Sequence, residues 1–323
     1  MVGSDPSGSP LQSVSAGARA TEAFELLGNE TRLAILVALW EQYEPFGRDG
    51  AVRFSELRAR VGTADSGRFN YHLDRLDDHF VESTDDGYRL SEAGLTFVRS
   101  VIAGAGIEDP ALEPSDVDAA CTLCGAGVRV TYEDGLVRVL CTECEGLWAG
   151  DDRRYGQLAE FPLHPAGLVD RSPEEVYAAA WVNGFQNLYS MLEEVCPTCT
   201  GRVERSLDVC DAHDADGRCG DCGRRTRTVA RLRCTVCKDW AQATMGAVAK
   251  YHPAVVGFCY DHGLELQYGF NDLAAIRERL ERAGSDVALP SVDPPRVAVT
   301  TELDGDGIRL ELDVDLSVVA VET

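Results

Sequence analysis

All twelve cysteines of the 323-residue chain lie between Cys121 and Cys259, and most occur in pairs separated by two residues. Such a pair supplies two thiolates to one metal ion, so two pairs brought together complete a tetrahedral site. The first two pairs, CTLC and CTEC, are Cys121, Cys124, Cys141 and Cys144. The segment between them alternates in polarity around Asp134-Gly135, which predicts a β-hairpin that brings the pairs together. Spacing and hairpin together predict a structural zinc ribbon.

A denser group of ligand residues follows, in four further pairs of the CxxC or CxxH type. They are Cys196, Cys199, Cys210, His213, Cys219, Cys222, Cys234 and Cys237. Eight ligands suffice for two more four-coordinate zinc sites. Sequential pairing would join the first four ligands and the last four, and an interleaved pairing is also compatible with the sequence. Either arrangement leaves each site closed to substrate, which favours structural sites. Cys259 and His262 have no partner pair and are interpreted as a core thiol and a surface imidazole.

Two other chemistries use paired cysteines. Disulfides are rare in the cytoplasm, where we expect this chain, because its N-terminus has neither the basic nor the apolar region of a signal peptide. Apolar runs such as AILVALW are far shorter than the roughly 20 residues that cross a bilayer, so no membrane partner is expected. A rubredoxin-like iron site has the ligand spacing of a zinc ribbon and stays open as an alternative.

An arginine-rich stretch lies within the second cysteine group. Its members are Arg218, Arg224, Arg225, Arg227, Arg231 and Arg233. On a metal-bound hairpin these side chains could contact DNA phosphate or a second copy of the chain. They could equally offset the negative charge of the thiolates and donate to the sulfur atoms. The sequence leaves both roles open.

Residues 65–80 have the pattern of a helix with one apolar and one polar face, which Asp65 or Ser66 can cap. The apolar positions that recur with the helical period are Phe69, Leu73, Leu76 and Phe80. The other face carries the candidate DNA contacts Ser66, Arg68, Asn70, Tyr71 and Arg75. A helix that enters the major groove by its N-terminus needs donors near its start. An ordinary amphipathic surface helix is the alternative, and His72 is expected nearer the buried face.

The flanking residues favour the DNA-binding interpretation. Asn29 can cap a helix whose predicted buried face is Leu33, Leu36, Val37 and Trp40. Residues 54–61 predict a second helix that ends at Gly62, and a short turn then leads into the helix from Ser66, as in a helix-turn-helix. Residues 80–90 predict a hairpin, or wing, that carries Arg89, and Ser91 begins a last helix.

The segments LLGNETRLAILVALWE, FSELRARVG, SGRFNYHLDRL and DDGYRLSEAG together resemble the ArsR-type winged-helix transcriptional regulators, in the acidic form found in halophilic archaea. The resemblance covers roughly residues 20–105. It implies a homodimer that binds double-stranded DNA through the helix from Ser66, with the hairpin near the phosphate backbone. It does not imply arsenic sensing, because no cysteine precedes Cys121. Residues 106–323 resemble the zinc-ribbon regions attached to such regulators, and the resemblance supplies neither their role nor an effector.

The net charge of −24 would ordinarily argue against a nucleic-acid partner. Lys238 and Lys250 are the only lysines, however, and aspartate is abundant. An acidic, lysine-poor surface fits a protein that works in concentrated salt, where charges are screened beyond a few ångströms. DNA affinity would then depend on close contacts from residues such as Arg68 and Arg75.

The predicted fold class is α+β, with a winged helix-turn-helix followed by a mixed α/β region that contains the zinc ribbon. Expected segments are a disordered tail 1–19, a DNA-binding domain 20–105, a linker 106–117, a zinc ribbon 118–150, a helical segment 151–195, a second cysteine-rich region 196–263, and a helix with a β-hairpin 264–323. The helical segment should begin at Ser172 and carries an aromatic ladder, which is core or lines a pocket or interface. Its members are Tyr177, Trp181, Phe185 and Tyr189.

No nucleophile, base and orienter set is visible, so the predicted function is transcription regulation and not catalysis. A metal- or redox-responsive sensor, whose thiolates control DNA binding, is the alternative hypothesis. A zinc enzyme is a third, and it would require a site with at most three protein ligands.

Overall fold

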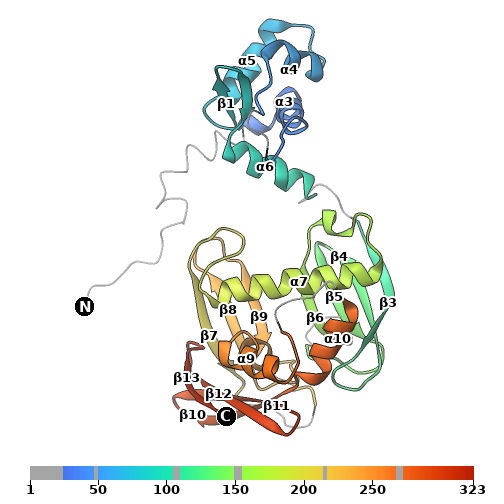
Figure 1. The fold of residues 1–323 in the computed structure, drawn as a ribbon, viewed down its shortest axis with the longest axis vertical. Coiled ribbons are helices and arrows are strands. Elements are labelled where there is room, and N and C mark those ends of the chain that lie inside the picture. Colours follow the sequence, from blue (N-terminus) through green and yellow to red (C-terminus); the bar gives the residue numbers. More distant parts are fainter. Residues whose placement is uncertain (1–24, 47–49, 105–109, 149–154, 214–216, 267–271) are drawn as a thin grey trace, which may run out of the picture. The chain divides into compact units, whose positions relative to one another are not determined.

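A computed structural model describes residues 25–46, 50–104, 110–148, 155–213, 217–266 and 272–323 (Figure 1). The chain divides into two compact units, Met1–Ile107 and Glu108–Thr323. The fold is mixed α+β, and all paired strands of the described sheets run antiparallel. No helix in the described part of the chain is long and apolar enough to cross a membrane. The predicted tail, residues 1–19, lies outside the described residues.

The N-terminal unit has four helices and one hairpin in its described elements. They are α3 (Glu30–Trp40), α4 (Phe54–Val61), α5 (Ser66–Leu76), β1 (Val81–Thr84), β2 (Gly87–Leu90) and α6 (Glu92–Ile102). The predicted caps are confirmed, because the side chains of Asn29, Asp65 and Ser91 accept backbone N–H groups at the starts of α3, α5 and α6. Gly62 ends α4 in the left-handed region, with φ of 73°. The hairpin turns at Asp85 and Asp86.

The face of α3 that packs into the core differs from the predicted one. Leu36 is buried as expected, but Leu33 and Val37 are 37% and 46% exposed. Arg32 is buried instead, with its guanidinium donating to the carbonyls of Leu26 and Glu25. Because apolar residues occur on almost every side of α3, its pattern alone could not select the buried face.

The helix from Ser66 is shorter than residues 65–80. It ends at Leu76, and Asp78 follows in the left-handed region with φ of 62°. Phe80 is nevertheless buried, because the turn directs it into the same core as Phe69 and Leu73. His72 is buried as expected, with a relative exposure of 6%.

The C-terminal unit begins with a four-stranded sheet in the order β3-β4-β5-β6. Its strands are β3 (Leu112–Ala120), β4 (Gly127–Glu133), β5 (Leu136–Cys141) and β6 (Gln157–Pro162). The β4–β5 turn falls at Asp134-Gly135, as predicted. The 106–117 segment is not all linker, because β3 begins at Leu112. The 151–195 segment is not all helix, because it contains β6 and a 3₁₀ turn (η1, Pro165–Leu168) before α7 (Pro173–Leu192).

Two further sheets follow, with orders β7-β8-β9 and β10-β11-β12-β13. Their elements and intervening helices are β7 (Val203–Val209), β8 (Thr228–Cys234), β9 (Trp240–Thr244), α8 (Met245–Ala249), α9 (Pro253–Asp261), α10 (Leu273–Arg282), β10 (Ser285–Val292), β11 (Pro295–Leu303), β12 (Asp306–Leu312) and β13 (Val318–Glu322). The predicted C-terminal hairpin is therefore part of a larger sheet. In β12 the buried residues Ile308, Leu310 and Leu312 alternate with more exposed ones, but the strand ends at Leu312, and Val314 beyond it is 38% exposed.

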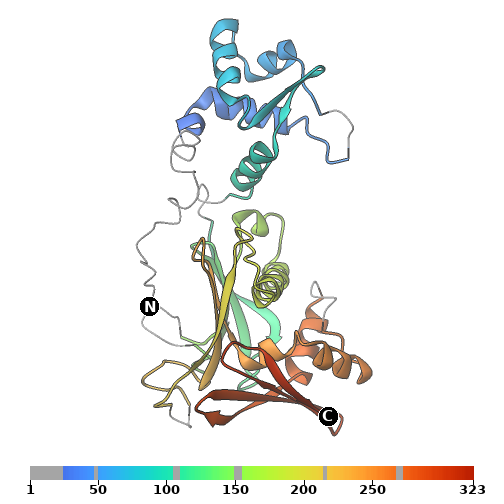
Figure 2. The same cartoon turned by 90° about the vertical axis from the view of Figure 1, so that its left-hand side faces the viewer.

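Helix α7 connects two hydrophobic cores of the C-terminal unit (Figure 1). Its first half buries Val176, Tyr177 and Ala180 against the β3–β6 sheet. Its last turn buries Met191 and Leu192 in the core that also contains β8, β11 and β12. Figure 2 shows α7 nearly end-on beside the strands. The helix thus holds the two halves of this unit together.

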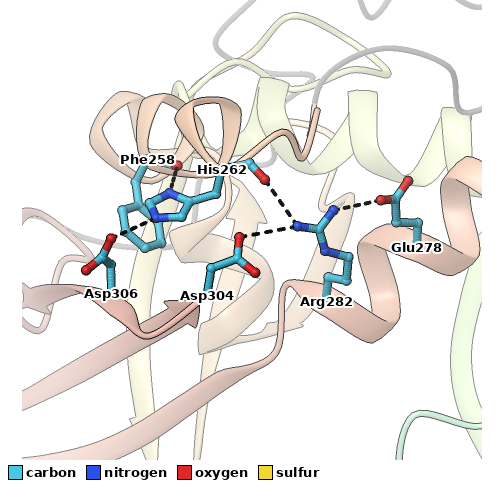
Figure 3. A network of polar contacts seen from close by, with 6 residues as sticks. All are labelled: Phe258, His262, Glu278, Arg282, Asp304 and Asp306. Carbon is cyan, nitrogen blue, oxygen red and sulfur yellow. Dashed lines mark hydrogen bonds and ion pairs between the residues drawn. The ribbon is translucent and has the colours of Figure 1, made fainter.

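A polar network fixes α10 to α9 and to the turn before β12 (Figure 3). His262 contacts the carbonyl of Phe258 at 2.8 Å and the carboxylate of Asp306 at 3.2 Å. Both contacts favour the imidazolium, so they raise the pKa of His262. Arg282 of α10 donates to the carbonyl of His262 and pairs with Glu278. His262 is thus a half-buried bridging residue and not a free surface imidazole.

Candidate functional site

The twelve predicted ligands converge into three clusters, in each of which four ligand atoms lie within 4.8 Å of one another. The first is Cys121, Cys124, Cys141 and Cys144. The β4–β5 hairpin brings its two pairs together, since Val128 of β4 lies opposite Cys141 of β5. Cys121 and Cys141 are buried, whereas Cys124 is exposed. The site lies where β3 and β5 end, since Cys121 follows β3 directly and Cys141 is the last residue of β5.

The other eight ligands pair in a nested arrangement, not in the sequential one. The outer pairs form one cluster, Cys196, Cys199, Cys234 and Cys237, and the inner pairs form another, Cys210, His213, Cys219 and Cys222. The register of the β7–β8 hairpin explains the nesting. Val203 lies opposite Cys234 at one end, and Val209 lies opposite Thr228 at the other, so each end of the hairpin carries one cluster.

The distances within each cluster fit a tetrahedral ion. Sulfur atoms lie 3.7 Å and 3.5 Å apart in the first cluster, and 3.5 Å apart in both measured pairs of the outer cluster. In the inner cluster, Cys210 and Cys219 are 4.0 Å apart, and the Cys222 Sγ lies 3.5 Å from His213 Nδ1. Four ligands at about 2.3 Å from a metal ion stand roughly 3.8 Å apart. A disulfide would require about 2.05 Å, so the described cysteines are free thiols.

In two of the clusters, a turn stabilises one of its thiols, Cys141 or Cys234, as a thiolate. Backbone N–H groups of Glu143 and Cys144 donate to Cys141 Sγ at 3.4 Å and 3.2 Å. Burial alone would raise the pKa of Cys141, but these donors reverse the effect and lower it to about 7. Cys234 receives the same pair of donors from its own turn, and its pKa is lowered to about 6. Since the thiolate is the form that binds metal, these turns favour metal binding.

The inner cluster is joined to the first by backbone pairing. Trp148, which follows the first cluster, bridges Arg224, and Arg225 donates its N–H to the carbonyl of Leu147 at 3.1 Å. These contacts lie within the C-terminal unit and connect its two hairpins. The predicted ligands therefore stabilise a single folded region and not three separate modules.

Three members of the arginine-rich stretch are held within this hairpin. Arg224 is buried and pairs with Asp208, which also contacts Arg231 at 2.9 Å. Arg227 donates to the carbonyl of Cys210 at 3.2 Å. This geometry favours the local charge-balancing role for these residues, although Arg227 and Arg231 are exposed, as are Arg218 and Arg233.

The candidate DNA contacts of α5 lie on its solvent-exposed side. Ser66, Arg68, Asn70, Tyr71 and Arg75 are all exposed. Tyr71 is 59% exposed, so its ring is not part of the hydrophobic core. Asn70 donates to Asp74 at 2.7 Å, and Arg89 of β2 pairs with Glu82 across the hairpin at 2.8 Å. Arg68 and Arg75 are the two exposed arginines of α5.

The aromatic ladder of α7 has two roles, which periodicity could not separate. Tyr177 is buried under the β3–β6 sheet, whereas Phe185 and Tyr189 line a cavity with Lys250 and Arg279. These two cations were not among the predicted site residues. The only signal in the sequence is that Lys250 is one of two lysines and lies in the apolar segment AVAKYH.

Comparison with known protein families gives two matches and no function. Residues 20–101 match the family described as a domain of unknown function, DUF7347. Residues 118–318, more than half of the chain, match a second family with the same description, DUF7351. No curated protein matches the chain. With its three Cys/His clusters inside the matched region, the chain belongs to the DUF7351 family.

Proposed function

We propose that this protein is a sequence-specific DNA-binding transcription regulator of the ArsR-like winged-helix kind, whose C-terminal unit is stabilised by zinc. The observation that carries the proposal is the exposed face of α5, with Arg68 near the helix start, Tyr71 in the middle and Arg75 in the last turn. The order of α4, a four-residue turn, α5 and the β1–β2 hairpin supports a winged helix-turn-helix.

In this proposal α5 enters the major groove. Arg68 is near the N-terminus of α5, where the helix dipole also favours phosphate, and its planar guanidinium suits bidentate contact with guanine. Tyr71 and Arg75 follow on the same face. Asn70 would have to release Asp74 before its amide could read adenine. Arg89 would exchange Glu82 for a DNA phosphate, a contact that positions the protein without reading sequence.

The Cys/His clusters take a structural role in this proposal. Each supplies four ligands, as closed structural zinc sites do, and catalytic sites keep one position open. We therefore propose no reaction for the chain. The resemblance of residues 20–105 to dimeric regulators supports a homodimer in the cytoplasm, and the exposed Leu33 and Val37 on α3 are apolar surface that a second copy could cover.

A binding titration on DNA tests the proposal. Sites selected from random duplexes would be compared with scrambled DNA at high KCl by fluorescence anisotropy. Arg68→Ala and Tyr71→Ala should fold as wild type and lose discrimination, at about 1–3 kcal/mol for each base contact. Arg129→Ala is the matched control, because this exposed arginine pairs with Asp116 in the other unit. If both α5 variants fold and discriminate as wild type does, α5 is not the reader.

The sensor alternative predicts a different result in the same assay. A regulator with structural zinc should keep both its metal and its DNA affinity after mild oxidation, because Cys121, Cys141, Cys196 and Cys234 are buried. Joint loss of metal and of DNA binding would favour a redox- or metal-responsive sensor.

A further inference from the structure

A cavity of about 410 Å³ lies between α7, the end of α8 and α10, away from the three Cys/His clusters. Its α7 wall is Val182, Phe185, Gln186 and Tyr189, which share one helix face. Tyr251 stacks on Tyr189 with ring centroids 5.9 Å apart and donates its hydroxyl to the carbonyl of Phe185 at 2.8 Å. The aromatic wall is therefore fixed in place. The volume of the cavity falls in the usual range of small-molecule sites, about 300–1,000 Å³.

Two cations face this largely apolar cavity. Lys250 follows α8, and its ammonium group has no hydrogen-bond or ion-pair partner among the described residues. Burial lowers the pKa of Lys250, and the nearby Cys259 opposes this shift. Arg279 is 7% exposed, and its guanidinium is held by the carbonyl of Glu265. In a chain with 54 acidic residues, none of the described residues that line this cavity is an aspartate or a glutamate.

Helix α10 forms the wall opposite α7, through Ile276, Arg279 and Leu280. Arg282, one turn beyond Arg279, is anchored by the network with His262 and Asp304 (Figure 3). Arg277 binds Asp118 of β3 at 2.6 Å on the other side. Because both sides of α10 are anchored, the cavity is a preformed site.

We propose that this cavity binds a small apolar carboxylate, with its ring or acyl body against Phe185, Tyr189 and Tyr251 and its acid group on Lys250. The chemistry of the walls carries the inference. An apolar ligand body matches the aromatic and aliphatic lining, and one negative charge compensates an ammonium group that has no acidic partner among the described residues. A strongly hydrated polyanion such as phosphate would leave the aromatic wall unused. The proposal does not rest on DNA binding.

Calorimetric titration of the full chain with naphthalene-2-carboxylate, and with naphthalene-2-carboxamide as the neutral isostere, tests the proposal. The carboxylate should bind with a stoichiometry of one per chain, and the amide at least tenfold more weakly. Lys250→Met keeps the length of the side chain but removes its charge, so it should abolish this preference. Lys238→Met is the matched control, because it removes the only other lysine, which is exposed.

The two-lysine composition allows a direct readout of the site. In protein labelled with ¹³C at lysine Cε, the carboxylate should shift the Lys250 signal and leave the Lys238 signal unchanged. Thermal unfolding verifies that Lys250→Met is folded. Equal affinity for acid and amide, an unchanged preference in folded Lys250→Met, or no binding by wild type would each overturn the proposal. Loss of DNA binding in the α5 variants leaves all these results unaffected.

Discussion

Among single residues, His72 links the stability of the N-terminal unit to pH. It is buried on the inner side of α5, and its Nδ1 has no hydrogen-bond partner among the described residues. Burial lowers its pKa below the ordinary value of 6.5, with further lowering from the nearby Arg32 and Arg68. The unfolded chain therefore binds a proton more readily than the folded chain, and acid favours unfolding.

We predict that the N-terminal unit loses stability as pH falls below 6.5, and that His72→Leu removes this part of the dependence. One titrating group changes the free energy of unfolding by at most about 1.4 kcal/mol per pH unit. Hydrogen exchange of the α5 amides, followed by mass spectrometry on the full chain between pH 7.5 and 5, measures the effect. His79→Leu, at an exposed histidine three residues after the helix, is the comparison variant. The same slope in wild type and His72→Leu would contradict the prediction.

At the scale of elements, the packing of α6 on the hairpin depends on a close approach at Gly94. A Cβ atom at this position would overlap the carbonyl oxygen of Phe80, whose backbone also accepts the N–H of Ser91 at 3.0 Å. Both the base of the hairpin and the start of α6 are therefore fixed at this point. An overlap with backbone is costly because no side-chain rotation relieves it.

Gly94→Ala should destabilise the N-terminal unit by about 3 kcal/mol, the upper part of the usual range for overpacking. Gly67→Ala is the control, since a Cβ there meets only the Asp65 carboxylate at 3.4 Å and alanine favours helix. Urea unfolding of the full chain, monitored by exchange of the α5 and α6 amides, compares the two. A Gly94→Ala protein as stable as Gly67→Ala would show that α6 does not pack this closely.

At the scale of the whole molecule, metal content and folding should be coupled in one unit only. The three clusters lie between Cys121 and Cys237, all in the C-terminal unit. We predict about three zinc ions per chain, and chelation should unfold the C-terminal unit while α5 keeps its exchange protection. Native mass spectrometry with circular dichroism and hydrogen exchange measures both effects.

Variants distinguish the cluster thiols from the core thiol. Cys196→Ser should reduce the number of bound zinc ions per chain from about three to about two, because it removes one of the four ligands of a cluster. Cys259→Ala should leave the count unchanged, since this buried cysteine packs in the hydrophobic core. A wild-type count near one would mean that the nested clusters do not hold metal.

The sequence alone determined the features that depend on a few neighbouring residues. The caps at Asn29, Asp65, Ser91 and Ser172 are set by side chains that reach the next two or three backbone N–H groups. The Asp134-Gly135 turn and the helical period of α5 are equally local. The set of twelve ligands was also predictable, because each turn carries its own pair of ligands.

Only the tertiary structure decided which distant segments meet. The nested pairing follows from the β7–β8 register, which joins residues 19 to 31 positions apart, and no local pattern encodes that register. The same holds for α3, which buries Arg32 and leaves Val37 exposed, and for the division of the α7 ladder between core and cavity. Periodicity shows that a helix has an apolar face, but burial depends on the surfaces that pack against it. The place of Lys250 in the cavity was decided in the same way, because α7 and α10, which line the cavity with it, are distant from it in sequence.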